Sequence, residues 1–133
     1  MVFQLQKGDP RALRAAIKEK INYRKERHPL EYPNIGSIFK NVAVSQIPKK
    51  LLPDLKAVIK QDPFPVVPTA FLIHKAGLRG VSYGGAMISP KHPNFIVNVL
   101  QATAEDVKAL IELVKFTVKK TFDITLEEEI IYV

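Results

Sequence analysis

The sequence contains no cysteine and no tryptophan, and it has no long apolar run. Without cysteine the chain can form neither disulfides nor thiolate metal sites, an absence that suits a cytosolic protein. No segment approaches the ~20 apolar residues of a membrane-spanning helix, and residues 1–7 lack the apolar core of a signal peptide. We therefore expect a cytoplasmic protein without membrane association.

The chain does have an excess of positive charge. Its 133 residues, 47% of them apolar, fit one domain of ordinary composition. The formal net charge is +7 and the sequence pI is about 9.7. Such a balance favours a polyanionic partner or ligand, and composition alone does not choose between nucleic acid and a nucleotide diphosphate.

The amino-terminal part reads as a short strand followed by a basic helix. Alternating apolar residues predict a strand over residues 2–6. Asp9-Pro10 predicts a helix start, and Pro29 disfavours helical geometry in the residue before it. The two faces of this helix differ in character. The apolar face carries Leu13, Ala16, Ile17 and Ile21, and the basic face carries Arg11, Arg14, Lys18, Lys20, Arg24, Lys25 and Arg27.

The remaining sequence alternates short strands with helices. The patterns predict strands over residues 37–44, 81–89, 95–100 and 124–132, the second of them broken by Gly84-Gly85. They predict helices over residues 47–60, 70–76 and 103–120, the last capped by Thr103 with Asp106 in capping-box spacing. This order predicts a two-layer α+β domain.

Several stretches carry residues suited to chemistry, although each also has a plainer interpretation. On a regular strand Ser37, Phe39 and Asn41 share a face, but spacing alone favours a turn serine before a partly exposed strand. The glycines around Arg79 and at Gly84-Gly85 match neither a P-loop nor a dinucleotide fingerprint, and turn glycines explain them better than a phosphate site.

The histidines and a run of glutamates are further residues suited to binding or catalysis. The three histidines, at 28, 74 and 92, lack metal-ligand spacing, so we expect no metal site. A run of three glutamates, residues 127–129, reads first as a solvated edge. In an extended segment, however, Glu128 points away from its two neighbours, so one glutamate can face a cleft.

Read in order, these stretches resemble the carboxy-terminal domain of the MurB family, the UDP-N-acetylenolpyruvoylglucosamine reductases of peptidoglycan synthesis. The resemblance covers about residues 9–133. The motifs that carry it are PLEYP (29–33), GSIFKN (36–41), AGLRG (76–80), GGAM (84–87), KHPNFIVN (91–98) and LEEEI (126–130).

The resemblance implies an incomplete enzyme with a mainly antiparallel sheet packed against helices. Family members carry an FAD-binding region ahead of this domain, which the chain lacks. Residues 1–8 would be a retained last strand of that region, and residues 9–133 the substrate-binding domain. FAD and NADPH would act in the complete enzyme, and this chain alone should bind neither and be inactive.

The resemblance also implies a reaction and its residues. The family reduces UDP-N-acetylglucosamine enolpyruvate to UDP-N-acetylmuramate. Ser37 would donate the proton, and Glu129 would polarise the substrate carboxylate, while the family's catalytic arginine lies in the missing region. Lys40, Asn41, Arg79 and His92 would bind substrate.

The chain departs from the family pattern at two places. The family pattern has Pro where Val42 stands, and Val-Arg where Ile130-Ile131 follows Glu129.

Two rival hypotheses remain for the function of the chain. A degenerate domain that kept only the fold is one of them. A basic nucleic-acid-binding module is the other, but the chain lacks the tryptophan platforms typical of single-strand binding, so we expect no nucleic-acid partner.

Overall fold

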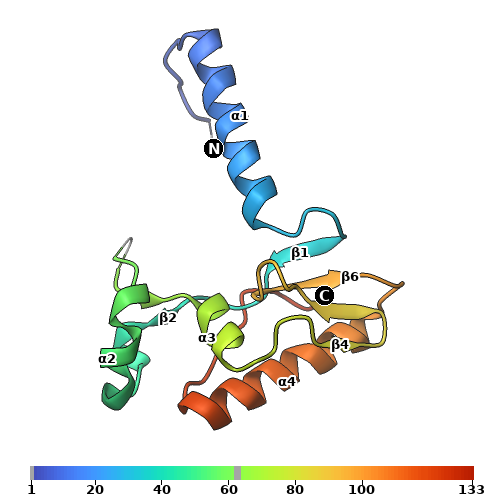
Figure 1. Ribbon diagram of the computed structural model, residues 1–133. Coiled ribbons are helices and arrows are strands. Elements are labelled where there is room, and N and C mark those ends of the chain that lie inside the picture. Colours follow the sequence, from blue (N-terminus) through green and yellow to red (C-terminus); the bar gives the residue numbers. More distant parts are fainter. Residues whose placement is uncertain (1, 62–63) are drawn as a thin grey trace.

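The computed structural model describes residues 2–61 and 64–133, which form an α+β domain preceded by a separate helix (Figure 1). The α-helices are α1 (Pro10–Arg27), α2 (Leu52–Leu55), α3 (Thr69–Lys75) and α4 (Ala104–Phe122). The strands are β1 (Asn34–Ser37), β2 (Val42–Ala43), β3 (Val66–Val67), β4 (Ser82–Tyr83), β5 (Ala86–Ile88) and β6 (Phe95–Asn98). None of the helices in these residues is both long and apolar enough to cross a membrane.

A four-stranded antiparallel sheet forms the upper layer of the domain in Figure 1, with strand order β1-β6-β5-β4. α4 packs beneath it against β4 and β5, and it also contacts α3. β2 and β3 form a second, two-stranded antiparallel sheet. The predicted α+β class, with an antiparallel sheet packed against helices, is confirmed.

The core lies between the sheet and α4. Apolar residues three and four apart put one stripe of α4 inside, as the helical period requires. The buried residues of that stripe are Leu110, Ile111, Val114 and Val118. The predicted cap at Thr103 is confirmed, because its hydroxyl accepts the Asp106 N–H at 3.2 Å while the Asp106 carboxylate accepts the Thr103 N–H at 2.9 Å. Local signals therefore fix where the main packing helix begins.

The Gly84-Gly85 pair makes a hairpin turn between β4 and β5, so the predicted single broken strand was wrong. Gly84 has a φ of +53°, which favours glycine. A side chain at Gly85 would lie 2.1 Å from the Leu100 carbonyl oxygen. The close approach at this turn is therefore made by the protein's own backbone, which supports turn glycines over a phosphate site.

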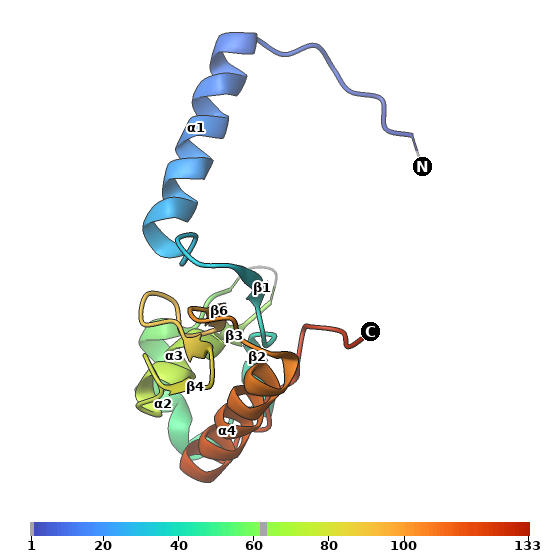
Figure 2. The same cartoon turned by 90° about the vertical axis from the view of Figure 1, so that its right-hand side faces the viewer.

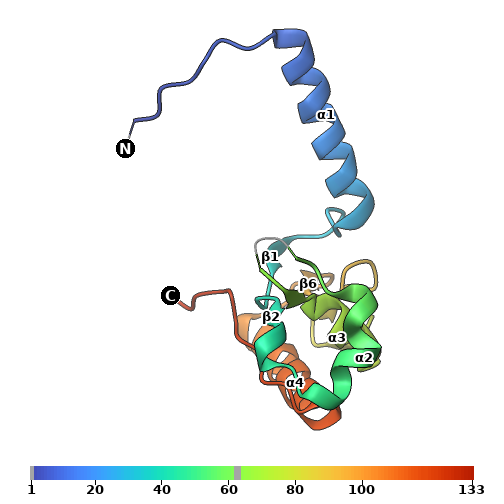
Figure 3. The ribbon, with the colours of Figure 1, turned by 90° about the vertical axis from the view of Figure 1, so that its left-hand side faces the viewer.

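α1 stands away from the rest of the domain, as Figures 2 and 3 show. Its predicted limits are confirmed: the Asp9 carboxylate caps it by accepting the N–H of Arg11 at 3.1 Å, and it ends before Pro29. No residue of α1 is buried, including those of its apolar face. Residues 2–6 form no strand, since a strand needs a hydrogen-bonded partner and none lies beside them in the described residues.

Two further predicted elements are replaced by irregular structure. Residues 47–60, predicted as one helix, divide into 3₁₀ turns (Lys49–Leu51 and Lys56–Val58) around the short α2. Pro53 lies at the start of α2, where it lacks the N–H that a continuous helix would use. Residues 124–132, predicted as a strand, make only a single bridge, from Glu128 to Phe39.

Candidate functional site

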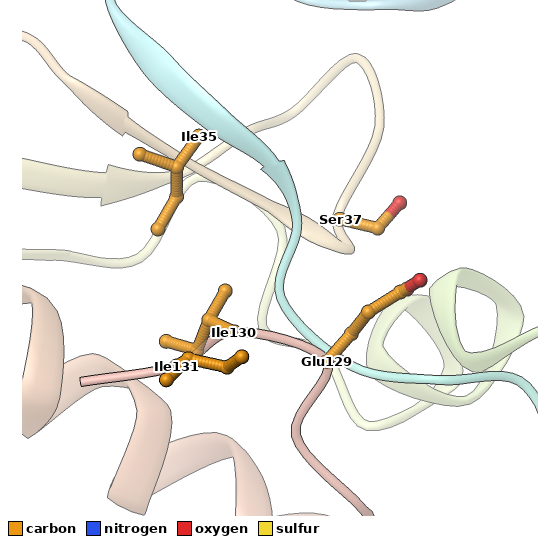
Figure 4. Close-up of a pocket in the computed structure, with 5 residues that line it drawn as sticks. All are labelled: Ile35, Ser37, Glu129, Ile130 and Ile131. Atoms are coloured by element: carbon orange, nitrogen blue, oxygen red, sulfur yellow. The ribbon is translucent and has the colours of Figure 1, made fainter. Parts of the chain in front are cut away.

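Ser37 and Glu129 lie in the same pocket, although 91 residues separate them in the chain. The pocket has a volume of about 550 Å³ and is lined by Ile35, Ser37, Glu129, Ile130 and Ile131. Figure 4 shows the Ser37 hydroxyl and the Glu129 carboxylate pointing toward the same side of the pocket. The isoleucines cover the other side, so the pocket has one polar and one apolar wall.

Backbone hydrogen bonds next to these residues set their relative position. The Glu129 N–H donates to the Ile38 carbonyl at 2.8 Å, and the Lys40 N–H donates to the Glu127 carbonyl at 2.9 Å. The segment that follows Ser37 is therefore paired directly with the segment that carries Glu129. A proton donor and a carboxylate on two such paired segments can act on one substrate group.

The three glutamates face different partners, in the alternation expected for an extended segment. Glu127 pairs with Lys40. Glu128 faces α4, where the Lys115 ammonium lies 3.0 Å from its carboxylate, and it accepts the Tyr132 hydroxyl at 2.6 Å. Only the third glutamate of the run reaches the Ser37 pocket.

Glu128 attaches the C-terminal segment to α4. The Tyr132 hydroxyl, followed by the Lys115 ammonium, holds the pKa of Glu128 below its usual range. Glu128 therefore stays ionised and bonded to α4. These two contacts of Glu128, called here the α4 clamp, leave the neighbouring Glu129 on the side of the Ser37 pocket.

A second pocket of about 480 Å³ adjoins the first, and Glu129 lines both. It brings together two predicted substrate-binding residues, Lys40 and Asn41, with Phe64 and Glu127. Its lining of amide, hydroxyl, ammonium and carboxylate groups suits a polar ligand. The two pockets, which share Glu129 in their linings, are the candidate site.

The predicted shared face of Ser37, Phe39 and Asn41 was wrong. The β1–β6 register shifts between Asn34 and Ser37, and both Ile38 and Phe39 are buried. Such an irregularity breaks the simple alternation of a strand. Ser37 and Asn41 consequently line different pockets.

Asn41 also supports the fold around its pocket. Its side-chain oxygen accepts the N–H of Thr69, at the start of α3, at 3.2 Å. The Thr69 hydroxyl in turn donates to the Lys40 carbonyl at 2.6 Å. Asn41 therefore connects the start of α3 to the segment that lines the second pocket.

Arg79 and His92 lie away from both pockets. The exposed Arg79 guanidinium donates to the Pro90 carbonyl, with the Nε–O distance 2.8 Å. The half-buried His92 ring packs on Phe95 and, 5.6 Å away centre to centre, on the ring of His28. Both residues therefore belong to one region, around residues 90–92, that these pockets do not reach. No three metal-ligating side chains gather in the described parts of the chain.

The histidine pair predicts a loss of stability in acid. Burial is the largest cause lowering the pKa of both His28 and His92, with Arg24 and Lys91 adding to it at His28. The nearby charges of His28 and Lys60 lower the pKa of His92 further. The folded-state pKa values lie below the ordinary 6.5, so the unfolded chain binds protons first. The contribution of the two neutral histidines to the free energy of unfolding is therefore complete above about pH 6.5. It is lost as the pH falls through their lowered folded-state pKa values.

We expect the melting temperature to fall between pH 7 and 5 more steeply in the natural chain than in a His28→Gln/His92→Gln double variant. Thermal unfolding followed by circular dichroism measures both slopes. His74→Gln, at an exposed position on α3, is the matched control and should keep the natural slope. Equal slopes for the double variant and the natural chain would contradict this role of the pair.

The sequence did not predict some of the residues that line the two pockets. Ile35 lies two residues before Ser37, and Ile131 two residues after Glu129, so extended-chain alternation was a usable signal for both. Phe64 comes from a proline-rich loop without any period, and nothing in the sequence marked it.

Comparisons with known proteins agree with this architecture. Residues 28–133 match the family described as UDP-N-acetylenolpyruvoylglucosamine reductase, C-terminal domain. UDP-N-acetylenolpyruvoylglucosamine reductase 2 of Symbiobacterium thermophilum is 38% identical over 130 residues, which are 98% of this chain and 35% of that protein. The reductase of Chloroherpeton thalassium is 45% identical over 113 residues, 85% of this chain and 31% of that protein.

A solved structure leads to the same family. The crystal structure of the reductase (MurB) from Thermus caldophilus superposes with a TM-score of 0.60 at 28% identity, over 95% of this chain and 37% of that one. The chain thus spans about a third of the length of the curated relatives it matches. It belongs to the family of the UDP-N-acetylenolpyruvoylglucosamine reductases and corresponds to their C-terminal domain.

Proposed function

We propose that this chain is the substrate-binding and proton-donating domain of a flavin-dependent reductase that converts UDP-N-acetylenolpyruvoylglucosamine to UDP-N-acetylmuramate with NADPH. The observation that carries the proposal is the pocket that Ser37 and Glu129 share. The relatives' printed name supplies the substrate class. A polar pocket beside it, with a lysine and an asparagine, suits the nucleotide-sugar part of such a substrate.

Ser37 donates a proton from Oγ to one carbon of the substrate double bond. FAD reduced by NADPH, when bound by the flavin-binding region, supplies the hydride for the other carbon. A serine hydroxyl is a weak acid, so positive charge must favour the alkoxide left behind. Lys40 lines the neighbouring pocket and is paired with Glu127, so a further positive charge from the flavin-binding region would be needed beside Ser37.

Glu129 acts on the carboxylate of the enolpyruvyl group. Its position between the two pockets lets it contact both the reacting end of the substrate and the nucleotide-sugar end. Lys40 and Asn41 bind the latter. Arg79 and His92 bind substrate only if the diphosphate extends toward residues 90–92, outside these two pockets.

A flavin-binding region, on the same or another chain, is the proposed partner of the amino-terminal part. Val2, Phe3 and Leu5 are 97%, 75% and 86% exposed, and the apolar face of α1 is also uncovered. A relative about three times as long aligns with 98% of this chain, so the matched part includes α1. Packing them against the flavin-binding region would bury an otherwise exposed apolar surface.

Ligand binding by the chain alone tests the proposal. We expect calorimetric titration with UDP-N-acetylglucosamine enolpyruvate to give weak, saturable binding, and Lys40→Met to weaken it about tenfold through loss of a charged hydrogen-bond donor. Lys119→Met is the matched control, since Lys119 pairs with Asp123 at the far end of α4 and lines neither pocket.

Two results would contradict the proposal. One is equal affinity for the natural chain and Lys40→Met. The other is tighter binding to single-stranded DNA than to the UDP-sugar, falling steeply with salt, which would favour the basic nucleic-acid-binding module instead.

A further inference from the structure

Asn94 is a buried polar residue that lines neither pocket of the candidate site. Its side chain is 4% exposed. The carboxamide oxygen accepts the Phe39 N–H at 3.0 Å, and the carboxamide nitrogen donates to the Phe39 carbonyl at 2.8 Å. The backbone carbonyl of Asn94 accepts the Ile38 N–H at 2.9 Å. Asn94 thus satisfies three backbone groups of two consecutive residues, Ile38 and Phe39, in the segment that follows Ser37.

The opposite edge of that segment pairs with the C-terminal segment. The Ile38 carbonyl accepts from Glu129, and Lys40 donates to Glu127. Residues 38–40 therefore lie between Asn94 on one side and the glutamate run on the other. Ser37 and Glu129 are both attached to this short stretch, so its placement sets the distance between them.

We propose that Asn94 is a positioning residue that fixes Ser37 relative to Glu129 for proton transfer. This inference rests on the proposed function of Ser37. Asparagine suits the role because a carboxamide both accepts and donates, and so reproduces the pairing of a neighbouring strand just before the start of β6. Solvent water cannot take over this pairing, because Phe39 is only 2% exposed.

Loss of the carboxamide would leave the Phe39 N–H and carbonyl buried without partners. Unpaired buried backbone groups are costly, so the segment would shift to regain partners. A displacement of about 1 Å in a catalytic geometry can cost about 100-fold in rate. Ser37, two residues away, would move with the segment.

The test separates the two half-reactions in a reductase that joins this domain to a flavin-binding region. With Asn94→Ala we expect substrate-dependent oxidation of the reduced flavin to slow by about 10- to 100-fold. NADPH-dependent reduction of the flavin does not use Ser37, so it should stay within about twofold of the natural rate, as stopped-flow absorbance measures. Slowing of both half-reactions alike, or of neither, would overturn the positioning role.

Asn94→Asp supplies a second variant with a pH signature. The introduced carboxyl can replace both carboxamide bonds when protonated, but when ionised it repels the Phe39 carbonyl. We expect its oxidation step to recover toward the natural rate as pH falls, while the natural enzyme shows no such gain. A variant with the pH profile of the natural enzyme would contradict the proposal.

Two controls keep this inference distinct from simple destabilisation and from the proposed function. Val118→Ala removes buried volume from α4 away from the site, so it should lower the melting temperature and leave both half-reactions unchanged. Ser37→Ala tests the proposed function itself. If Ser37→Ala slows flavin oxidation and Asn94→Ala does not, only the positioning role fails; if Ser37→Ala is fully active, the proposed function fails.

Discussion

Replacing Ser37 by alanine is expected to slow substrate-dependent oxidation of the reduced flavin by about 100- to 10,000-fold, the usual contribution of a positioned acid or base. The measurement requires a reductase that joins this domain to a flavin-binding region. Removing the part-buried hydroxyl of Ser37 changes the volume of the pocket little, so the fold and the substrate affinity should also change little. The deficit should therefore appear in kcat more than in KM.

A matched serine on the surface provides the comparison. Ser82→Ala removes a hydroxyl from exposed β4, outside both pockets, and should leave the rate unchanged. Turnover of Ser37→Ala at the rate of Ser82→Ala would rule out Ser37 as the proton donor. The pocket would then have to use another acid, with Glu129 as the only other titratable side chain lining it.

Replacing Gly85 by alanine is expected to unfold the domain or destabilise it by at least ~3 kcal/mol. The added carbon would lie 2.1 Å from the Leu100 carbonyl oxygen and 2.5 Å from the Ala102 nitrogen. Both are backbone atoms just before α4, so neither can rotate away as a side chain would. Relief would require β5 to separate from the start of the helix on which it packs. Denaturant unfolding of the chain measures the loss.

Gly80→Ala separates crowding from backbone strain. Gly80 has a φ of +76°, but a side chain there would meet nothing within 4 Å. Its substitution should cost only the ~1–2 kcal/mol of a left-handed backbone. If both alanine variants lost equal stability, close approach at Gly85 would not be the reason for its glycine.

Local signals predicted the ends of the long helices, and distant contacts decided the rest. Asp9 and Thr103 cap their helices through hydrogen bonds within three residues, which a sequence displays directly. The turn at Gly85 depends instead on the backbone at Leu100, fifteen residues later. The predicted strand at the C-terminus needed a partner along its whole length, and it found one only at Phe39.

The sequence pointed to candidate residues of the site, but it did not show how they lie in space. Ordered motifs identified Ser37 and Glu129, yet their meeting depends on backbone bonds between residues 38–40 and 127–129. No periodicity encodes that pairing. Nor does any pattern show that Asn94, part of an apparent turn, would bind the backbone of Phe39 with both ends of its carboxamide.

The glutamate run has a consequence for comparing sequences. Each of its three members meets different surroundings: the Lys40 ammonium, the α4 clamp, and the Ser37 pocket. A one-residue shift in an alignment would still pair glutamates in two of the three columns while exchanging these surroundings. The letter E at this point therefore carries little information about equivalence. A homologue is better aligned here by its counterparts of Lys40 and Lys115. These two lysines identify the equivalents of Glu127 and Glu128, and the remaining glutamate is then the equivalent of Glu129.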